Sequence, residues 1–588
     1  MTAFFAFESK KISLISGTFN NFAVAFSARF PCFRARIFSR RSLIFCRRAM
    51  NILRLQLISS RSFACRLKRW ARIVHIACIA TLVAQSLFVA RTLSAQALSP
   101  KQALALIQAD TVGLRGVEAL QAELASIVAD SALSSATVGL YVSSLKTKEA
   151  LFAYNENKTM TPASNMKIIS TASAMDYLGA NFTYTTTVFL DGILKKSSGE
   201  FVGNVIIRGS GDPSMSLAFF DDPLSILRQW CWALDSLGVR SIRGSIVGDD
   251  SYFDDEPWGA GWAWDDMPYY YSAQISALSF YDNTIDIAVK PAYSVGQVAE
   301  ARFEPQTPYI TLVNSVRTVP KDSLASVSVM RQAYSNVVYL AGTIAAADSA
   351  NPTAAERTLS VSVDNPTLFM VSLFKKALEE QGIPVRGGIF DAKQWGEKIA
   401  YAEMRPVCYH VSPPLKDIAR NINTVSNNLA AEMVWRTAAK ELTGKGNADK
   451  AAEMSRQFAE KNSFSLKGAN LADGSGLSRL NLLSSKQIVG ALAAMYNSKN
   501  RTAFMRSLAV PGERGTLQNR FKGTIAEKTL KAKTGTLTGV SALSGYITTR
   551  EQEPIAFSMI FNGYALPASV IRAFQEMICL RLAGFARQ

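Results

Sequence analysis

The sequence predicts a mixed α/β (α+β) fold in which a helical domain is interrupted by a β-rich insertion. Three observations predict this fold. In residues 162–179, apolar side chains recur every three to four positions, as on a helix with one buried face. From about 182 to 395, β-branched and aromatic residues stand between turn signals. From Pro413 onward the pattern is helical again, and the chain closes with strands and a last helix at 530–582.

The predicted elements follow one another without an internal repeat. Helices are expected from Ser99 to Ile127, and strand signals follow from Thr137 to Leu151. The other predicted strands are 183–190, 201–208, 242–247, 541–549 and 555–562. The other predicted helices are 223–237, 366–381, 416–424, 429–442, 485–496 and 567–582. An aromatic-rich loop, 258–271, lies inside the β-rich stretch and suits the wall of a pocket or a core.

Charge is distributed unevenly along the 588 residues, which suffice for two to four domains. The net charge is +18, but residues 1–97 hold 16 of the 64 basic residues and one acid, Glu8. The other residues therefore carry 48 basic and 45 acidic side chains. A nucleic-acid binder is expected to have a basic face on its folded domain, so this near-neutral body argues against nucleic acid as a partner.

The basic leader, residues 1–97, resembles an export signal. Basic residues at 66–72 precede an apolar run, 73–90, and Ala95-Gln96-Ala97 follows with the small-x-small pattern of a cleavage site. Translation from Met50 would leave a more ordinary leader. We expect cleavage before Leu98 and a location in the periplasm or cell envelope. The apolar run is also long enough to be retained as an anchor, and peripheral membrane association stays open.

Cysteine and histidine limit the chemistry. Beyond the leader the cysteines are Cys231, Cys408 and Cys579, an odd number without metal-ligand spacing, so no disulfide framework is indicated. The only histidines are His75, in the apolar run, and His410. A histidine-rich zinc site is therefore excluded, and a Ser-His-Asp triad could use only His410, which is better explained as a structural residue at a strand end.

A candidate nucleophile lies at the start of the helix predicted over 162–179. Pro162 suits a helix start, which puts Ser164 in the first turn and Lys167 on the same face three residues later. A lysine amine within reach can activate a serine hydroxyl, and the helix N-terminus favours the negative charge that develops there. Ser143 and Lys146 repeat the spacing, but they belong to a predicted strand and its turn, so we treat them as a chance match.

Two further motifs complete an ordered set of three. Ser426-x-Asn428 lies between two predicted helices, and Lys533-Thr534-Gly535 lies on a predicted strand. Ser498-x-Asn500 repeats the second motif by chance, whereas Lys-Thr-Gly occurs once. Each motif alone is a weak signal. In this order and in these contexts, the three are the set found in penicillin-binding proteins and class A β-lactamases.

Acyl transfer gives each motif a task. Lys167 can act as the base for Ser164 if burial and neighbouring cations lower its pKa. Lys533 supplies such a cation, and with Thr534 and Thr536 it can hold a substrate carboxylate. No cofactor or metal ion is needed for these tasks.

The remaining groups would serve the transition state and the leaving group. Backbone amides of Ser164 and Thr536 would form the oxyanion hole. Ser426 could relay a proton to the leaving amine while Asn428 orients the peptide. Gly535 would let its strand approach the substrate closely.

The chain resembles the D-alanyl-D-alanine carboxypeptidase/endopeptidase family, the class C low-molecular-mass penicillin-binding proteins. The resemblance covers roughly residues 99–585, and about 260 residues separate Lys167 from Ser426, a spacing that class A β-lactamases lack. The matching segments are 162–167, 209–213, 265–266 with 272–273, 426–429, 473–479, 515–517 and 532–546. Small departures are Gly209-Ser210-Gly211-Asp212-Pro213 for the usual three glycines, and Ser-Asn-Asn as the second motif.

The resemblance implies a serine β-lactamase/transpeptidase-like domain, an antiparallel sheet flanked by helices, which an insertion of one or two β-rich domains interrupts. The implied boundaries are 98–181 and 396–588 for the two parts of this domain and 182–395 for the insertion. The implied activity is that of an exported serine DD-peptidase that hydrolyses D-Ala-D-Ala termini or D-Ala-diaminopimelate cross-links. Its partners would be peptidoglycan peptides, with β-lactam antibiotics as covalent inhibitors.

The resemblance also implies that Asp266 binds the free amine of diaminopimelate, although capping of a turn by Asp265 and Asp266 is an equal alternative. Two other functions stay open. A β-lactamase or esterase could use the same Ser-Lys machinery, but the chain lacks an E-x-x-L-N segment. A catalytically inactive wall-binding protein is expected to lack Ser164, Lys167 or Lys533, and all three are present.

Overall fold

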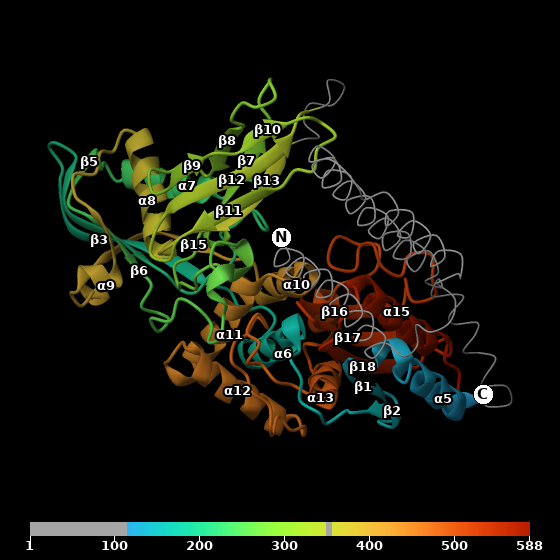
Figure 1. Ribbon diagram of the computed structural model, residues 1–588. Coiled ribbons are helices and arrows are strands. Elements are labelled where there is room, and N and C mark those ends of the chain that lie inside the picture. The colour runs from blue at the N-terminus through green and yellow to red at the C-terminus, as the bar shows by residue number, and fades with distance from the viewer. Residues whose placement is uncertain (1–114, 348–355) are drawn as a thin grey trace, which may run out of the picture. The chain divides into compact units, whose positions relative to one another are not determined.

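The computed structural model describes residues 115–347 and 356–588 (Figure 1). The predicted leader, residues 1–97, lies outside the described residues, as does the part of the first predicted helical region before residue 115. Within the described residues, no helix is both long enough and apolar enough to cross a membrane.

A five-stranded antiparallel sheet organises the first and last parts of the chain. Its strand order is β16-β17-β18-β1-β2, so strands from the start of the described chain pair with strands from its end (Figure 1). The strands are β1 (Thr137–Ser144), β2 (Ala150–Tyr154), β16 (Leu530–Leu537), β17 (Val540–Thr548) and β18 (Pro554–Asn562). This sheet and the helices around it are called the main domain below.

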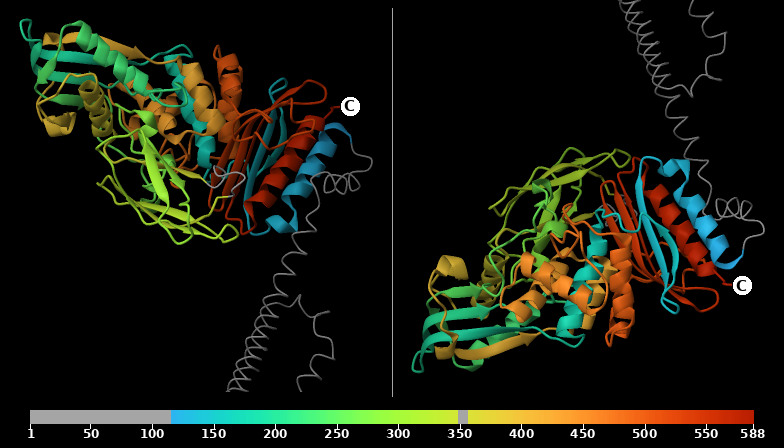
Figure 2. Two further views of the ribbon diagram at one scale, coloured as in Figure 1. Left: turned by 90° about the horizontal axis from the view of Figure 1, so that it is seen from above. Right: turned by 90° about the horizontal axis from the view of Figure 1, so that it is seen from below.

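Helices cover both faces of this sheet (Figure 2). Successive side chains of a strand point to opposite faces, and β17 shows the result. Leu543 and Ile547 pack with α5 and α15, whereas Ala542 and Tyr546 pack with α6 and α13. The helices of the main domain are α5 (Gly116–Val128), α6 (Met166–Leu178), α10 (Leu415–Val425), α11 (Asn428–Thr443), α12 (Ala448–Lys461), α13 (Ser485–Tyr496), α14 (Arg501–Ser507) and α15 (Ala568–Gly584). Of these, α12 and α14 were not predicted.

The elements from β3 to β15 form the inserted block. Its largest sheet has the order β14-β6-β4-β3-β15, with β5 also beside β4, and it mixes parallel and antiparallel pairs. The strands are β3 (Thr185–Lys195), β4 (Glu200–Arg208), β5 (Ser241–Arg243), β6 (Ile246–Asp249), β14 (Ile389–Asp391) and β15 (Arg405–Val411). Helices α7 (Leu224–Ser236), α8 (Pro366–Glu380) and the short α9 (Ala392–Trp395) accompany it.

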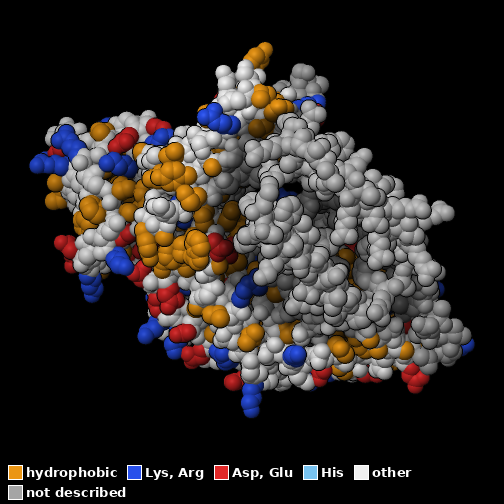
Figure 3. All heavy atoms as spheres, viewed as in Figure 1, with side chains coloured by type: hydrophobic (Ala, Val, Ile, Leu, Met, Phe, Trp, Pro, Cys, Tyr) orange, Lys and Arg blue, Asp and Glu red, His pale blue; other side chains and the backbone are white. Residues whose placement is uncertain are grey.

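Two smaller sheets complete the inserted block. One is antiparallel, with the order β13-β7-β8, and the other has the order β10-β12-β11 with β9 beside β12. Their strands are β7 (Thr284–Lys290), β8 (Glu300–Glu304), β9 (Thr311–Asn314), β10 (Arg317–Val319), β11 (Val327–Arg331), β12 (Val337–Ala345) and β13 (Arg357–Ser362). Figure 3 shows hydrophobic side chains on the surface of this block, and Met330 and Tyr339 are among its exposed residues.

The inserted block has its own hydrophobic core and joins the main domain through a small apolar cluster. Residues of β3 to β15, with α7 and α8, share one core. In the small cluster, Phe253, Ile275 and Ala277 of the block pack against Leu429 and Met433 of α11. Helix α11 therefore carries the second motif at its start and a contact with the inserted block along its first turns.

Strand β16 packs directly against η3 (Ala163–Asn165), the turn before α6. The contact is closest at Gly535, where a Cβ would lie 2.7 Å from Pro162 O and 3.2 Å from Ala163 Cβ. Both of these atoms belong to rigid parts of the chain. Gly535 thus allows the strand to approach the turn that carries Ser164, whereas the sequence analysis expected it to serve an approach to the substrate.

Replacing Gly535 with alanine is expected to destabilise the protein by about 1–3 kcal/mol, because the added methyl group overpacks this contact. Gly584→Ala, at the end of α15, is the matched control, since the nearest atom to its Cβ is 3.5 Å away. That change is expected to be neutral or to stabilise by up to about 1 kcal/mol. Urea unfolding of both variants measures the difference in the free energy of unfolding. Equal midpoints would show that the contact accommodates the added methyl group.

Candidate active site

Ser164 lies in η3, directly before α6. The sequence predicted it in the first turn of the helix, and the structure gives that turn 3₁₀ geometry. Its neighbour Ala163 has a φ of 47°, which is uncommon for a residue with a side chain. Gly476 lies so close that a Cβ there would be 1.9 Å from Ala163 O. The turn is therefore held between Gly476 on one side and Gly535 of β16 on the other.

Lys167 is completely buried, and its amine faces three oxygen atoms. Nζ lies 3.2 Å from Ser164 Oγ, 2.6 Å from Asn428 Oδ1 and 2.6 Å from Ser475 O. Asn428 Nδ2 donates to Tyr271 O at 2.7 Å, which orients Oδ1 toward the lysine. A neutral amine has two N–H groups and one lone pair. Since Asn428 Oδ1 and Ser475 O can only accept, they take the two N–H groups and leave the lone pair for the hydroxyl proton of Ser164.

Burial sets the charge state of both lysines. It lowers the pKa of Lys167 to about 7, and nearby Asp473 and Glu432 act in the opposite direction. Burial also lowers the pKa of Lys533, and the charge of Lys167 lowers it further. The sequence predicted burial and neighbouring cations as causes of a lowered pKa for Lys167, and burial is the cause that lowers it in the structure. At neutral pH much of Lys167 is therefore unprotonated and able to accept a proton.

The second motif lies between α10 and α11, as predicted. Ser426 ends α10 with a left-handed backbone, φ 70° and ψ 40°. Asn427 caps α11 by accepting from Ala430 N at 2.9 Å, and its Nδ2 donates to Asp282 of the inserted block at 3.0 Å. The cap and the contact with Asp282 fix the residue that follows Ser426, and so hold the motif in this uncommon conformation.

The third motif joins the second through Lys533. Its side chain is completely buried, and Nζ donates to Ser426 Oγ and to Thr534 O, both at 2.9 Å. Thr534 and Thr536 line the same cavity as Ser164. In its protonated form this amine, beside two hydroxyl-bearing residues, is suited to hold a carboxylate.

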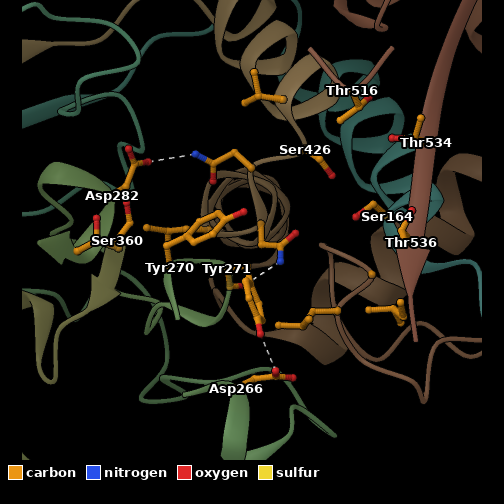
Figure 4. Close-up of a pocket in the computed structure, with 18 of the residues that line it drawn as sticks. Ser164, Asp266, Tyr270, Tyr271, Asp282, Ser360, Ser426, Thr516, Thr534 and Thr536 are labelled. Atoms are coloured by element: carbon orange, nitrogen blue, oxygen red, sulfur yellow. Dashed lines mark hydrogen bonds between the residues drawn. The ribbon is translucent and has the colours of Figure 1, made fainter. Parts of the chain in front are cut away.

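A cavity of about 780 Å³ connects these motifs with the inserted block. In Figure 4, Ser164, Ser426, Thr534 and Thr536 lie together on one side. Asp266 lies across the cavity from them, and one of its oxygens accepts from Tyr271 OH at 2.8 Å. The lining residues named in the sequence analysis are Ser164, Asp266, Ser426, Asn428, Thr534 and Thr536.

The repeated motifs and His410 lie elsewhere. Ser143 is on β1, where Oγ donates to Glu149 O at 3.2 Å, and Asn500 donates to Met175 O at 2.8 Å in the helical core. His410 Nε2 lies 3.6 Å from a carboxylate oxygen of Asp212, and burial lowers the pKa of this histidine to about 4. These placements agree with a structural role for all three.

Asp473 is a site residue to which the sequence analysis gave no role. It is completely buried. Its two carboxylate oxygens accept from Gly476 N, Ser478 N and Asn481 Nδ2, each at 2.6 Å, and from Trp262 Nε1 of the inserted block at 2.8 Å. It therefore shapes the loop that places Gly476 against the Ser164 turn. An aspartate at the start of the glycine-rich stretch Asp-Gly-Ser-Gly was the available signal.

A sequence model of the D-Ala-D-Ala carboxypeptidase 3 (S13) family matches residues 120–583. The chain belongs to this family. The D-alanyl-D-alanine carboxypeptidase of Actinomadura sp. (strain R39) is 33% identical over 489 residues, 81% of this chain and 87% of the relative. The D-alanyl-D-alanine carboxypeptidase DacB of Haemophilus influenzae is 25% identical over 435 residues, 73% of this chain and 86% of the relative. Membership confirms the predicted family and the predicted class of enzyme, a serine-type D-Ala-D-Ala carboxypeptidase.

Solved structures confirm the predicted fold. The crystal structure of penicillin binding protein 4 (dacB) from Haemophilus influenzae matches with a TM-score of 0.67 at 22% identity, over 79% of this chain and 99% of that one. A second structure of the same protein, complexed with a novel β-lactam, matches with a TM-score of 0.63 at 21% identity over the same shares. These likenesses show the shared architecture of main domain and insertion.

Acylation by penicillin is expected to rise with pH and to reach half of its plateau rate near pH 7. The reason is that the base is unprotonated Lys167, whose pKa is about 7. Lys167→Ala should slow acylation by roughly 10²–10⁴-fold, the usual contribution of a general base, and should remove the pH dependence. Stopped-flow acylation from pH 5 to 9 measures both, and a flat profile for the unaltered protein would contradict this assignment.

Lys533→Ala is the companion variant. It should also slow acylation strongly, because it removes a carboxylate anchor, but it should keep a rise with pH because Lys167 remains. The rise should move to higher pH, since two nearby cations lower each other's pKa. A normal rate in Lys533→Ala would contradict the role given to the third motif.

Proposed function

We propose that this chain is an exported serine DD-peptidase that cleaves peptidoglycan peptides through an acyl-enzyme on Ser164. The observation that carries the proposal is the geometry at Lys167. Its Nζ lies 3.2 Å from Ser164 Oγ while pure acceptors occupy its two other hydrogen-bond positions. This is the arrangement of a nucleophile with its own general base, and family membership supports the substrate class.

Acylation begins with attack of Ser164 Oγ on the carbonyl carbon of the penultimate D-Ala. Lys167 takes the hydroxyl proton as the new C–O bond forms. The carbonyl oxygen becomes an oxyanion, for which the backbone N–H groups of Ser164 and Thr536 are the candidate donors. Because these donors belong to fixed elements, η3 and β16, they need no rearrangement during the reaction.

Collapse of the tetrahedral intermediate breaks the C–N bond and releases the C-terminal residue. Its amine takes up the proton that Lys167 removed from Ser164, and Ser426 Oγ, which accepts from Lys533 Nζ at 2.9 Å, is placed to relay it. Lys533, Thr534 and Thr536 hold the carboxylate of the leaving residue, and Asn428 orients the peptide. Water then hydrolyses the acyl-enzyme. When the leaving amine belongs to diaminopimelate, the same steps cleave a cross-link.

The place of action follows from the substrate and from the leader. Peptidoglycan peptides lie in the cell envelope, and the basic, apolar leader with Ala95-Gln96-Ala97 resembles an export signal. We therefore assign the enzyme to the periplasm or cell envelope, with a mature chain that begins near Leu98. Peripheral contact with the membrane is compatible with this location.

Incubation with penicillin should add one acyl group to the protein, and Ser164→Ala should abolish the adduct without changing the fold. Intact-protein and peptide mass spectrometry locate the adduct, and Ser143→Ala is the matched control that should acylate normally. An adduct on Ser143 or on any other serine would contradict the assignment. A long-lived adduct identifies a penicillin-inhibited peptidase, whereas rapid turnover of penicillin would identify a β-lactamase.

Asp266 is proposed to bind the free amine of the substrate's diaminopimelate side chain. Its carboxylate lines the cavity across from Ser164, beside Tyr271. A charged hydrogen bond to an ammonium contributes on the order of 1–3 kcal/mol. Asp266→Asn should therefore lower kcat/KM about tenfold or more on peptides that carry the amine and leave peptides without it unchanged. Steady-state kinetics on a matched peptide pair decides this, and an equal loss on both peptides would assign Asp266 to the turn alone.

A further inference from the structure

The buried carboxylate of Glu432 lies behind the Ser164–Lys167 pair and has no part in the steps above. It is on α11, four residues after Asn428, so both side chains project from the same face of the helix. The residue is completely buried. Its Oε1 accepts from Gly474 N and from Ser475 N, both at 2.8 Å. Its Oε2 has no hydrogen-bond partner among the described residues.

Two consecutive peptide groups connect this carboxylate to the catalytic lysine. In the first, Ser475 N–H donates to Glu432 while Gly474 O accepts from Ser170 Oγ of α6 at 2.7 Å. In the second, Gly476 N–H donates to Asp473 at 2.6 Å while Ser475 O accepts from Lys167 Nζ at 2.6 Å. Each peptide group is thus held by a carboxylate at its N–H and by a side chain of α6 at its C=O.

The negative charge of Glu432 gives this arrangement an electrostatic role as well as a structural one. When Lys167 takes the proton of Ser164 it becomes a buried ammonium, and burial of an unpaired charge is costly. The positive groups facing this region are Lys533 on β16 and Arg436, which lies one turn beyond Glu432 on α11. The negative groups are Glu432 and Asp473, and both raise the pKa of Lys167.

We propose that Glu432 is a positioning residue whose carboxylate fixes the loop that carries Ser475 and balances the positive charge that forms on Lys167 when Ser164 gives up its proton. The proposal rests on the function proposed for Ser164 and Lys167. It requires that Glu432 is ionised while Lys167 accepts the proton. Burial raises the pKa of Glu432 to about 7 and the charge of Asp473 adds to the rise, whereas Arg436 and hydrogen bonding from Ser475 act against it.

The test is the pH dependence of penicillin acylation in Glu432→Gln. This change keeps the shape of the side chain and an acceptor oxygen for the two N–H groups, but it removes the charge. Loss of a nearby carboxylate lowers the pKa of a lysine, so the rise in rate should move to lower pH by about one unit. The plateau rate should also fall, because the amine becomes a weaker base. If the acylation rate of Glu432→Gln rises at the same pH as that of the unaltered protein, the proposal is overturned.

Three control variants separate charge from structure. Glu432→Asp keeps the charge. The pH at which its acylation rate rises should therefore stay near that of the unaltered protein, even if the plateau rate falls. Ser170→Ala removes a hydrogen bond from the same loop peptide without changing any charge, so its rise should not move. Glu460→Gln changes an exposed carboxylate on α12 and should alter neither rate nor pH dependence. If the pH at which acylation rises shifts as much in Ser170→Ala as in Glu432→Gln, the position of the loop alone causes the shift.

A second measurement holds even where Glu432→Gln fails to fold. Infrared spectra of the unaltered protein at the pH of the acylation plateau should show no buried carboxylic acid, because Glu432 is ionised there. A carboxylic acid band at that pH that changes in Glu432→Asp would overturn the proposal, because other buried carboxyl groups such as Asp282 also have raised pKa values. Neither result touches the proposed function itself, which depends on the penicillin adduct at Ser164 and not on the position of the pH profile.

Discussion

A lysine amine without access to water is the constraint on which the rest of this structure depends. Lys167 is completely buried, and each of its three hydrogen-bond positions faces an oxygen from a different segment: η3, the start of α11 and the loop at 473–479. Lys167 can act as a base only while these acceptors stay in place. A buried amine without hydrogen-bond partners would cost free energy, and its lone pair would no longer point toward Ser164 Oγ. The close packing at Gly476 and Gly535 likewise holds in place the turn that carries Ser164.

The inserted block supports this constraint as well as lining the cavity. Two of its polar contacts reach the second motif, Asp282 with Asn427 and the Tyr271 carbonyl with Asn428, and a third joins Trp262 to Asp473 of the neighbouring loop. Phe253, Ile275 and Ala277 also pack against α11 and add a hydrophobic contact beside these polar ones. These contacts make the geometry of the second motif depend on the inserted block as well as on the main domain.

Much of the fold and site could be predicted because the signals were local. Pro162 and Gly179 mark the ends of the segment that becomes η3 and α6, and the strand pair 541–549 and 555–562 is rich in apolar residues. Helix α12 was missed because its buried face consists largely of alanines, which give a weak periodic signal. The roles of Glu432 and Gly535 could not be predicted, since each acts through partners distant in sequence. Glu432, for example, bonds to residues 42 and 43 positions away.

The strand order of the five-stranded sheet has a consequence for how the enzyme is made. Strand β1 pairs with β18, and the side chains of Ser144 and Glu553, 409 residues apart, bond in the finished sheet. Ribosomes add about 5–20 residues per second, so roughly 20–80 s of synthesis separate these partners. For most of that interval Ser164 already exists, but β16 and Lys533 do not. The contact between Lys533 and Ser426, which joins the third motif to the second, therefore cannot form until the last strands have been made.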